Sequence, residues 1–198
     1  IDQNCVNDDP ILLSNIPDVT MQEDEQNCSI DLDNFFGDPE GDNLNYTVRG
    51  NEKIEITIDS QNIVCFIPDE NFFGNERVIF SANDGEFTTD SNEVTITVNQ
   101  VNDAPEIDSI FSNSPVVEEG VVRIEVLAHD IDNDELIYSI NDSKFEQDEN
   151  IFTWQTQIGD RGQYTFNVTV SDGELSDSQE VTITIIPKLF INEFSSGS

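Results

Sequence analysis

Polar and hydrophobic residues alternate with a period of two along most of this chain. Residues 53–59 (Lys-Ile-Glu-Ile-Thr-Ile-Asp) and 93–98 (Glu-Val-Thr-Ile-Thr-Val) are typical stretches. This alternation puts β-branched side chains on one face of a strand and polar side chains on the other, as a sheet with one solvated face requires. We find no segment with the 3.6-residue period of an amphipathic helix, so the pattern predicts an all-β protein.

Turn signals such as Asp-Gly, Pro-Asp and Gly-Asp interrupt the alternation about every eight to twelve residues, the spacing typical of a β-sandwich. The first half of the chain is expected to form seven strands, near residues 11–20, 28–34, 43–49, 53–59, 62–67, 76–82 and 92–99. A similar set of seven is expected between residues 106 and 186.

Aromatic residues stand at alternating positions of these strands. Trp154, Tyr164 and Phe166 do so in the second half of the chain, and Phe66 and Phe80 do so in the first. Aromatic residues in such places are more often part of a core than a platform for a ligand. We therefore expect these five side chains to be buried.

Three short motifs occur twice. Val6-Asn7-Asp8-Asp9-Pro10 returns 95 residues later as Val101-Asn102-Asp103-Ala104-Pro105. The segment 38–46 (Asp-Pro-Glu-Gly-Asp-Asn-Leu-Asn-Tyr) returns at 130–138, and the Asp84-Gly85 turn returns at Asp172-Gly173. Self-similarity at a nearly fixed period predicts two like units in tandem. The expected organisation is residues 1–9 as the tail of a preceding unit, repeat one over 10–103, repeat two over 104–187 and a remainder over 188–198 of a longer chain.

Charge narrows the choice of partner. The 198 residues include 7 Lys and Arg against 42 Asp and Glu, a formal net charge of −35. Nucleic acid and anionic lipid are therefore excluded as expected partners, because both require a basic surface. No apolar run is long enough to span a bilayer. The acids either form a solvated surface, as in proteins of high-salt environments, or bind divalent cations. Their gathering in short acidic runs at repeated positions favours cation binding.

The sequence offers little for catalysis. His129 is the single histidine, and we find no nucleophile elbow, zinc-type ligand spacing or phosphate-binding loop. We therefore predict a non-enzyme. The three cysteines, Cys5, Cys28 and Cys65, all lie in the first half of the chain. Either all three are free, or one Cys5–Cys28 or Cys28–Cys65 bridge leaves one thiol over.

The repeated motifs as a set resemble those of cadherin-like repeats in microbial secreted and surface proteins. The resemblance rests on the Val-Asn-Asp-Ala-Pro linker, the acidic loop at 130–134, the Asp-Gly turns and the Asn71-Phe72-Phe73-Gly74 turn. It covers most of residues 5–187. It implies two seven-stranded Greek-key sandwiches of cadherin or Ig type, arranged end to end, with Ca²⁺ bound between consecutive repeats.

The resemblance also assigns ligand positions. For the junction between the repeats it implies ligands from both repeats: Glu23, Glu25, Asp69, Asn102, Asp103, Asp130, Asp132, Asp134 and Asp172. Glu23 and Glu25 are alternatives for one position, and Glu70 is the alternative to Asp69. For an upper and incomplete site it implies Asn7, Asp8, Asp38, Glu40 and Asp84. At the far end of repeat two, Glu118 or Glu119 and Asp160 look like half of a third site. The linker there, Ile186-Pro187-Lys188, has no Asn-Asp pair, so we expect no metal.

The linker between the repeats departs from the family pattern. Cadherin linkers run Asp-x-Asn-Asp-Asn, whereas this chain has Asn-Gln-Val-Asn-Asp-Ala over residues 99–104. The leading Asp and the second Asn are missing, which removes ligands from the usual three-ion cluster. We therefore expect one or two calcium ions.

These observations predict a calcium-stiffened stalk or adhesion segment of a secreted or cell-surface protein. Its partner, besides calcium, would be a glycan or another surface protein, bound through homophilic or heterophilic contacts. Two alternatives stay open: a carbohydrate-binding accessory module of a larger secreted protein, and a halophile-type acidic spacer with no specific metal.

Overall fold

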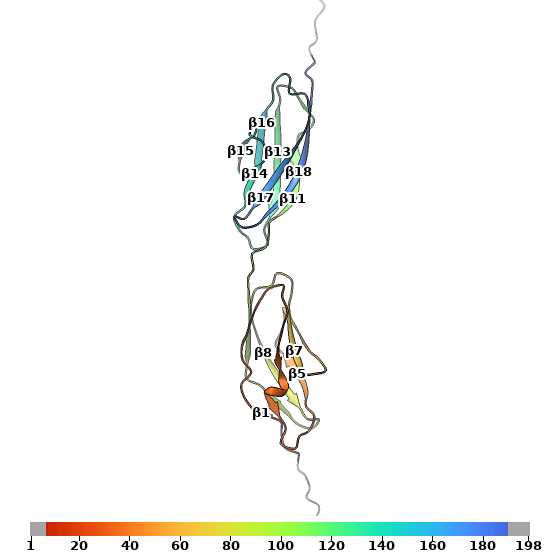
Figure 1. Ribbon diagram of the computed structural model, residues 1–198, viewed down its shortest axis with the longest axis vertical. Coiled ribbons are helices and arrows are strands. Elements are labelled where there is room, and N and C mark those ends of the chain that lie inside the picture. Colours follow the sequence, from red (N-terminus) through yellow and green to blue (C-terminus); the bar gives the residue numbers. More distant parts are fainter. Residues whose placement is uncertain (1–6, 190–198) are drawn as a thin grey trace, which may run out of the picture. The chain divides into compact units, whose positions relative to one another are not determined.

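The computed structural model describes residues 7–189, which form two β-sandwiches in tandem (Figure 1). The division between the two compact units falls between Val101 and Asn102, whereas the sequence placed it after Asp103. The all-β prediction is confirmed. A single 3₁₀ turn, Leu32–Asn34, is the only helical element in the described range.

Repeat one has two main layers. One sheet has the order β2-β10-β8-β5, with β9 added beside β8, and the other has the order β3-β7-β6. A short β1-β4 pair stands at one end. The strands are β1 (Ile11–Leu12), β2 (Val19–Gln22), β3 (Asn27–Asp31), β4 (Phe36–Gly37), β5 (Asn45–Arg49), β6 (Ile54–Ile58), β7 (Ile63–Pro68), β8 (Gly74–Asn83), β9 (Thr88–Asp90) and β10 (Val94–Asn99).

Repeat two repeats this plan. Its sheets have the orders β11-β13-β16-β15 and β12-β18-β17-β14. The strands are β11 (Glu106–Ser112), β12 (Val116–Val117), β13 (Val121–His129), β14 (Ile137–Ile140), β15 (Glu146–Asp148), β16 (Ile151–Gln155), β17 (Gly162–Ser171) and β18 (Ser176–Ile186). β11 and β12 are two halves of one first strand that changes sheets, so the sandwich has the seven strand positions expected of an Ig-like domain.

Each repeat has its own core, built from the inward residues of its two sheets. Phe66 and Phe80 are fully buried in repeat one, and Phe152 is fully buried in repeat two. Trp154 and Phe166 pack in the second core with exposed fractions of 6% and 3%. Tyr164 is partly buried against them, and its ring stands edge-on to Trp154 with the centroids 5.2 Å apart. The prediction that these aromatic residues build the cores is therefore confirmed.

Two expected strands are wrong in their extent. The strand expected at 11–20 is divided into β1 and β2, because the segment leaves β4 and crosses to pair in parallel with β10. Pro17, which lacks an N–H, lies in this crossing. The strand expected at 28–34 ends at Asp31, whose side chain accepts a hydrogen bond from the backbone N–H of Asp33 and so starts the 3₁₀ turn.

A disulfide joins β3 to β7 in repeat one. Cys28 and Cys65 form it, which selects one of the two bridges that the sequence left open. The register of β3 and β7 brings them together, because Asn27 lies opposite Phe66 and Ile30 opposite Val64. The third cysteine, Cys5, lies outside the described residues.

Candidate metal centre

The loop between β13 and β14 gathers three acidic side chains at the N-terminal end of repeat two. Asp130 Oδ1 accepts hydrogen bonds from the backbone N–H groups of Asp132 at 2.9 Å and Asp134 at 3.3 Å. Asn133 adopts a positive φ of 63°, a conformation that Asn tolerates well. This tight turn leaves one carboxylate oxygen from each of the three aspartates within 4.8 Å of the others. Oxygen ligands so close together are the chemistry that Ca²⁺ prefers.

The first two residues of repeat two are tied to this end of its sandwich. The side-chain nitrogen of Asn102 donates to Asp172 Oδ2 at 2.8 Å, and the backbone N–H of Asp103 donates to Asp132 Oδ2 at 2.8 Å. Asp172 begins the turn between β17 and β18, and its Oδ1 accepts from the backbone N–H groups of Glu174 and Leu175. The structure thus brings together the five acids and the Asn that the sequence assigned to this end.

Repeat one carries the same network at its own N-terminal end. Asn7 donates to Asp84 Oδ2 at 3.0 Å, as Asn102 does to Asp172. The backbone N–H of Asp8 donates to Glu40 Oε2 at 3.1 Å, and that of Glu40 donates to Asp38 Oδ1 at 2.9 Å. All five residues assigned to the upper site therefore take part in these hydrogen bonds, which form two sets joined through the adjacent residues Asn7 and Asp8.

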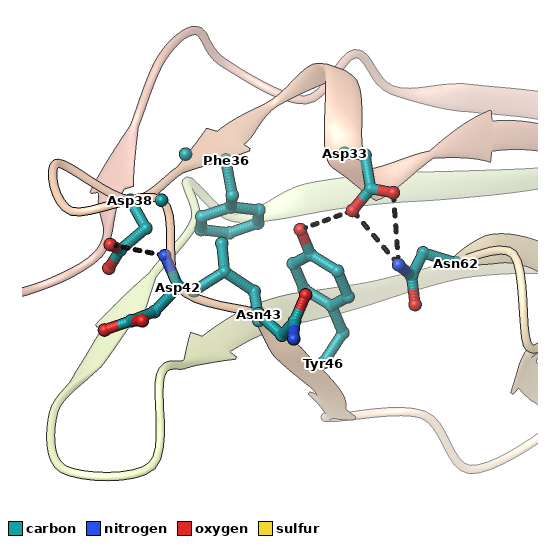
Figure 2. Close-up of a pocket in the computed structure, with 10 residues that line it drawn as sticks. Asp33, Phe36, Asp38, Asp42, Asn43, Tyr46 and Asn62 are labelled. Atoms are coloured by element: carbon teal, nitrogen blue, oxygen red, sulfur yellow. Dashed lines mark hydrogen bonds between the residues drawn. The ribbon is translucent and has the colours of Figure 1, made fainter.

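One member of the upper network was missed in the sequence. The backbone N–H of Asp42 donates to Asp38 Oδ1 at 3.0 Å, the same contact that Asp134 makes with Asp130 (Figure 2). The signal that could have found Asp42 is its place 92 residues before Asp134, the same spacing that relates Asp38 to Asp130.

Each network contains a buried carboxylate oxygen without a hydrogen-bond partner. These atoms are Oδ2 of Asp38 in repeat one and Oδ2 of Asp130 in repeat two. Leaving a buried acceptor unsatisfied costs about 1–3 kcal/mol, and more when the group is charged. A bound cation removes that cost, so these two oxygens are the best candidates for metal ligands in their networks.

At the opposite end of repeat one, Glu23 is almost fully buried, with an exposed fraction of 2%. Its Oε1 accepts from the backbone N–H of Val101 at 2.5 Å, and its Oε2 is buried without a hydrogen-bond partner. The other two acids assigned to this end lie at the surface: Glu25 is exposed, and Asp69 forms an ion pair of 3.4 Å with Lys53. Glu23 therefore has the clearest ligand character of the three.

Hydrogen bonds lower the pKa values of the two Asp-Gly aspartates. The amide of Asn102, followed by the backbone N–H groups of Leu175 and Glu174, holds the pKa of Asp172 below its ordinary value. Backbone N–H groups, led by that of Phe87, lower the pKa of Asp84 in the same way. Both side chains are thus carboxylates at neutral pH, the form that binds a cation.

A shallow cavity of about 260 Å³ lies beside the upper network in repeat one (Figure 2). On its wall the Tyr46 hydroxyl donates to Asp33 Oδ1 at 2.9 Å, and the Asn62 amide nitrogen lies 3.1 Å from both oxygens of Asp33. Desolvation first, and then Asp33, raise the pKa of Tyr46, so its hydroxyl keeps the proton that it donates. Phe36 also lines the cavity but is only 3% exposed, so it offers little ring surface to a ligand.

Two tandem sandwiches with seven strand positions each, and with acidic loops at matching ends, define an Ig-like tandem-repeat protein. The model of the bacterial Ig domain family matches the chain twice, over residues 7–97 and 102–184. The chain therefore belongs to the bacterial Ig domain family, and the prediction of tandem Ig-like repeats is confirmed. Domains of this family are non-catalytic modules and are usually found in extracellular or surface proteins.

Several solved structures are similar to this chain at low sequence identity. An endo-fucoidan hydrolase from glycoside hydrolase family 107, MfFcnA4, is 21% identical, with 96% of this chain and 30% of that chain covered and a TM-score of 0.43. The tandem Ig repeats of Dlar are 9% identical, covering 90% and 98% of the two chains with a TM-score of 0.34. SGBP-B from the mixed-linkage glucan utilization locus of Bacteroides ovatus, in complex with a mixed-linkage heptasaccharide, is 14% identical, covering 91% and 48% of the two chains with a TM-score of 0.36.

The chain thus spans less than a third of the length of the hydrolase that it resembles. Comparison with curated proteins gave no match. Within residues 7–189, the structure has no helix of the length and apolar character needed to cross a membrane.

Proposed function

We propose that this chain is an extracellular spacer or adhesion segment of a longer bacterial protein, whose repeats are stiffened where they meet by one or two Ca²⁺ ions. Asp130 carries the proposal, because one of its oxygens orders the acidic loop while the other is buried without a partner. Repeat two would supply the remaining ligands of its network: Asn102, Asp103, Asp132, Asp134 and Asp172.

Repeat one would contribute Glu23, whose buried Oε2 also has no hydrogen-bond partner. Asp69 is a weaker candidate because Lys53 already pairs with it, and Glu25 is an exposed alternative. An ion that takes ligands from both repeats would restrict their relative motion, whereas the empty joint would bend freely. The partner of such a segment would be another surface protein or a glycan.

Electrostatics supports a cation. Two like charges 4 Å apart repel by about 1 kcal/mol in water and by about 4 kcal/mol at the effective dielectric of a protein surface. The aspartates of the loop between β13 and β14 bring three carboxylates together in a chain whose net charge is −35. A divalent ion turns this mutual repulsion into attraction. The upper network, Asn7, Asp8, Asp38, Glu40 and Asp84, would bind more weakly without ligands from a preceding unit.

Thermal unfolding tests the proposal. The chain is unfolded in EDTA, in millimolar CaCl₂, in MgCl₂ and in NaCl of equal ionic strength. An ion that binds only the folded state increases the free energy of unfolding by mass action, by about 2.7 kcal/mol at a ligand concentration 100 times Kd. The midpoint temperature rises as a result. We expect a rise specific to calcium. An equal rise in NaCl would instead identify a halophile-type acidic surface.

Substitution locates the site. Asp103→Ala and Asp132→Ala should each remove the response to calcium, since their side chains belong to the proposed ligand set. Glu55→Ala is a matched control, because Glu55 is an exposed acid on β6 of repeat one. If calcium affinity survives both aspartate substitutions, the ligand assignment is wrong.

Carbohydrate binding is the weaker alternative. Sugar-binding modules stack a ligand on exposed aromatic rings, whereas Trp154 and Phe166 are buried and the exposed Phe73 and Phe111 are single rings in different repeats. Tyr164 is partly buried, and its hydroxyl donates to the backbone carbonyl of Asp160 at 2.9 Å. Saturable binding of an oligosaccharide that persists in EDTA would favour this alternative over a calcium-stiffened spacer.

A further inference from the structure

The two repeats place a glutamate at the same point of the fold. The backbone N–H of Glu23 donates to the carbonyl of Asn99 at 3.0 Å, and that of Glu118 donates to the carbonyl of Ile186 at 2.9 Å. In each repeat the residue two positions after that carbonyl donates its backbone N–H to the glutamate carboxylate. Val101, two residues after Asn99, donates to Glu23 at 2.5 Å, and Lys188, two residues after Ile186, donates to Glu118 at 3.1 Å. The two carboxylates are thus structural equivalents, at 2% and 7% exposure.

Their second oxygens differ. Glu118 Oε1 accepts from the backbone N–H of Gly159 at 2.7 Å, so both oxygens of Glu118 have protein donors. In repeat one the corresponding loop donates elsewhere, because the N–H of Asn71 bonds Asp24 Oδ1 at 3.1 Å. Glu23 Oε2 therefore stays buried without a partner. The end of repeat one therefore has a carboxylate oxygen available to a cation. At the end of repeat two, both oxygens of Glu118 already accept hydrogen bonds from the protein.

The charges differ in the same direction. Lys188 stands where repeat one has Val101, and its ammonium lies 2.5 Å from a carboxylate oxygen of Glu119. Donation by the N–H groups of Gly159 and Lys188, and after them the backbone N–H and the charge of Arg161, keep the pKa of Glu118 below its ordinary value. Repeat one has Lys53 at its corresponding end, paired with Asp69, so the end of repeat two has one basic residue more.

We infer that the C-terminal end of repeat two is closed to divalent cations, because the backbone N–H groups of Gly159 and Lys188 already donate to both carboxylate oxygens of Glu118. At Glu118 these two N–H groups take the part that calcium has been proposed to play at the end of repeat one. The comparison with a calcium-binding end in repeat one rests on the proposed function. The conclusion that Glu118 has no oxygen open to a cation rests only on the hydrogen bonds of Glu118 itself. The response of the chain to calcium is therefore asymmetric, and the connection that leaves repeat two at Pro187 is not stiffened by metal.

Amide NMR of the unmodified chain tests this without any substitution. Calcium is titrated from EDTA to several millimolar, and the backbone signals of Val101, Asp103, Gly159 and Lys188 are followed. We expect saturable shifts for Val101 and Asp103 and none for Gly159 and Lys188. Saturable shifts at Gly159 and Lys188 with calcium or with magnesium would overturn the closed end. Absence of shifts at all four positions would overturn the proposed calcium site and leave the closed end standing.

A matched pair of variants provides a second test. Glu118→Gln replaces one acceptor oxygen by an amide NH₂, which cannot accept from both Gly159 and Lys188. It should lower the unfolding midpoint of repeat two by several degrees, equally in EDTA and in calcium. Glu23→Gln should instead reduce the midpoint only in calcium. If Glu118→Gln acts only when calcium is present, Glu118 is a metal ligand and the inference is wrong.

Discussion

The side-chain amide of Asn102 donates a 2.8 Å hydrogen bond to Asp172, a residue 70 positions away in the sequence. The bond fixes the first residue of repeat two against the turn between β17 and β18, and Asn7 and Asp84 repeat it in the other sandwich. A contact conserved between the two repeats within one chain points to a shared structural role. For this reason its removal is the most direct test of how the N-terminal ends are ordered.

Asn102→Ala should raise the pKa of Asp172 toward its ordinary value of 3.8, because the Asn102 amide is the largest cause of its depression. A depressed pKa in the folded state contributes stability above the pKa of the unfolded state, and this stability is lost as pH falls through the folded value. The variant should therefore lose less stability between pH 5 and pH 3. Carboxyl NMR titration of Asp172 measures the shift directly, with Asp84 as the internal reference.

Asp130→Asn should separate calcium binding from folding. The amide oxygen can still accept from the N–H of Asp132, while one negative charge leaves the group of Asp130, Asp132 and Asp134. We expect an unchanged or higher unfolding midpoint in EDTA. We expect the calcium affinity to fall by roughly tenfold or more. Calorimetric calcium titration measures the affinity. A lower midpoint in EDTA with unchanged affinity would contradict the ligand role of Asp130.

Arg49 and Asp90 form a two-point ion pair at distances of 3.0 and 2.7 Å, and Ser81 donates to the same carboxylate at 2.6 Å. Arg49, and then Ser81, lower the pKa of Asp90 to about 2. The stabilisation is present above the ordinary value of 3.8 and disappears as pH falls toward 2. Arg49→Gln should return the Asp90 pKa toward 3.8 in an NMR titration, whereas Arg77→Gln should leave it unchanged.

Reduction of the Cys28–Cys65 disulfide should destabilise repeat one alone. The bridge closes a loop with a sequence separation of 37, for which chain entropy predicts about 4 kcal/mol. Scanning calorimetry with and without a phosphine reductant should show one transition moving down and the other staying in place. Repeat two, which has no cysteine, is the internal control. Equal movement of both transitions would mean that the repeats do not unfold separately.

Phe152→Ala tests the independence of the two cores. Phe152 is fully buried in repeat two, and truncating such a residue costs about 3–5 kcal/mol. The transition of repeat two should fall steeply while that of repeat one is unchanged. Phe80→Ala, in the core of repeat one, should give the reciprocal result.

Strands with strict alternation could be predicted from the sequence almost to the residue. The segment 53–59 became β6 (Ile54–Ile58), and 92–99 became β10 (Val94–Asn99), because one buried face is enough to fix such strands. The division of the first strand could not be predicted. It depends on which sheet each half joins, a tertiary choice that local pattern does not encode.

The acidic networks were partly visible in the sequence. The resemblance to cadherin-like repeats assigned Asp130, Asp132 and Asp172, and the repeat offset would have added Asp42 had it been applied to every residue of the motif. The contrast between Glu23 and Glu118 was not visible, because it depends on whether a distant loop turns its N–H groups toward the carboxylate. Which of the three cysteines pair likewise depends on the register of β3 and β7.

The parallel pairing of first and last strands has a mechanical consequence. β2 runs parallel to β10 over four residue pairs from Val19 and Ile96 to Gln22 and Asn99, and β12 runs parallel to β18. Tension applied to the two ends of either sandwich pulls these neighbouring strands in opposite directions along their length. Their backbone hydrogen bonds are then loaded together in shear, and none can be peeled off before the rest. Each repeat is therefore built to resist a pulling force with its terminal strands.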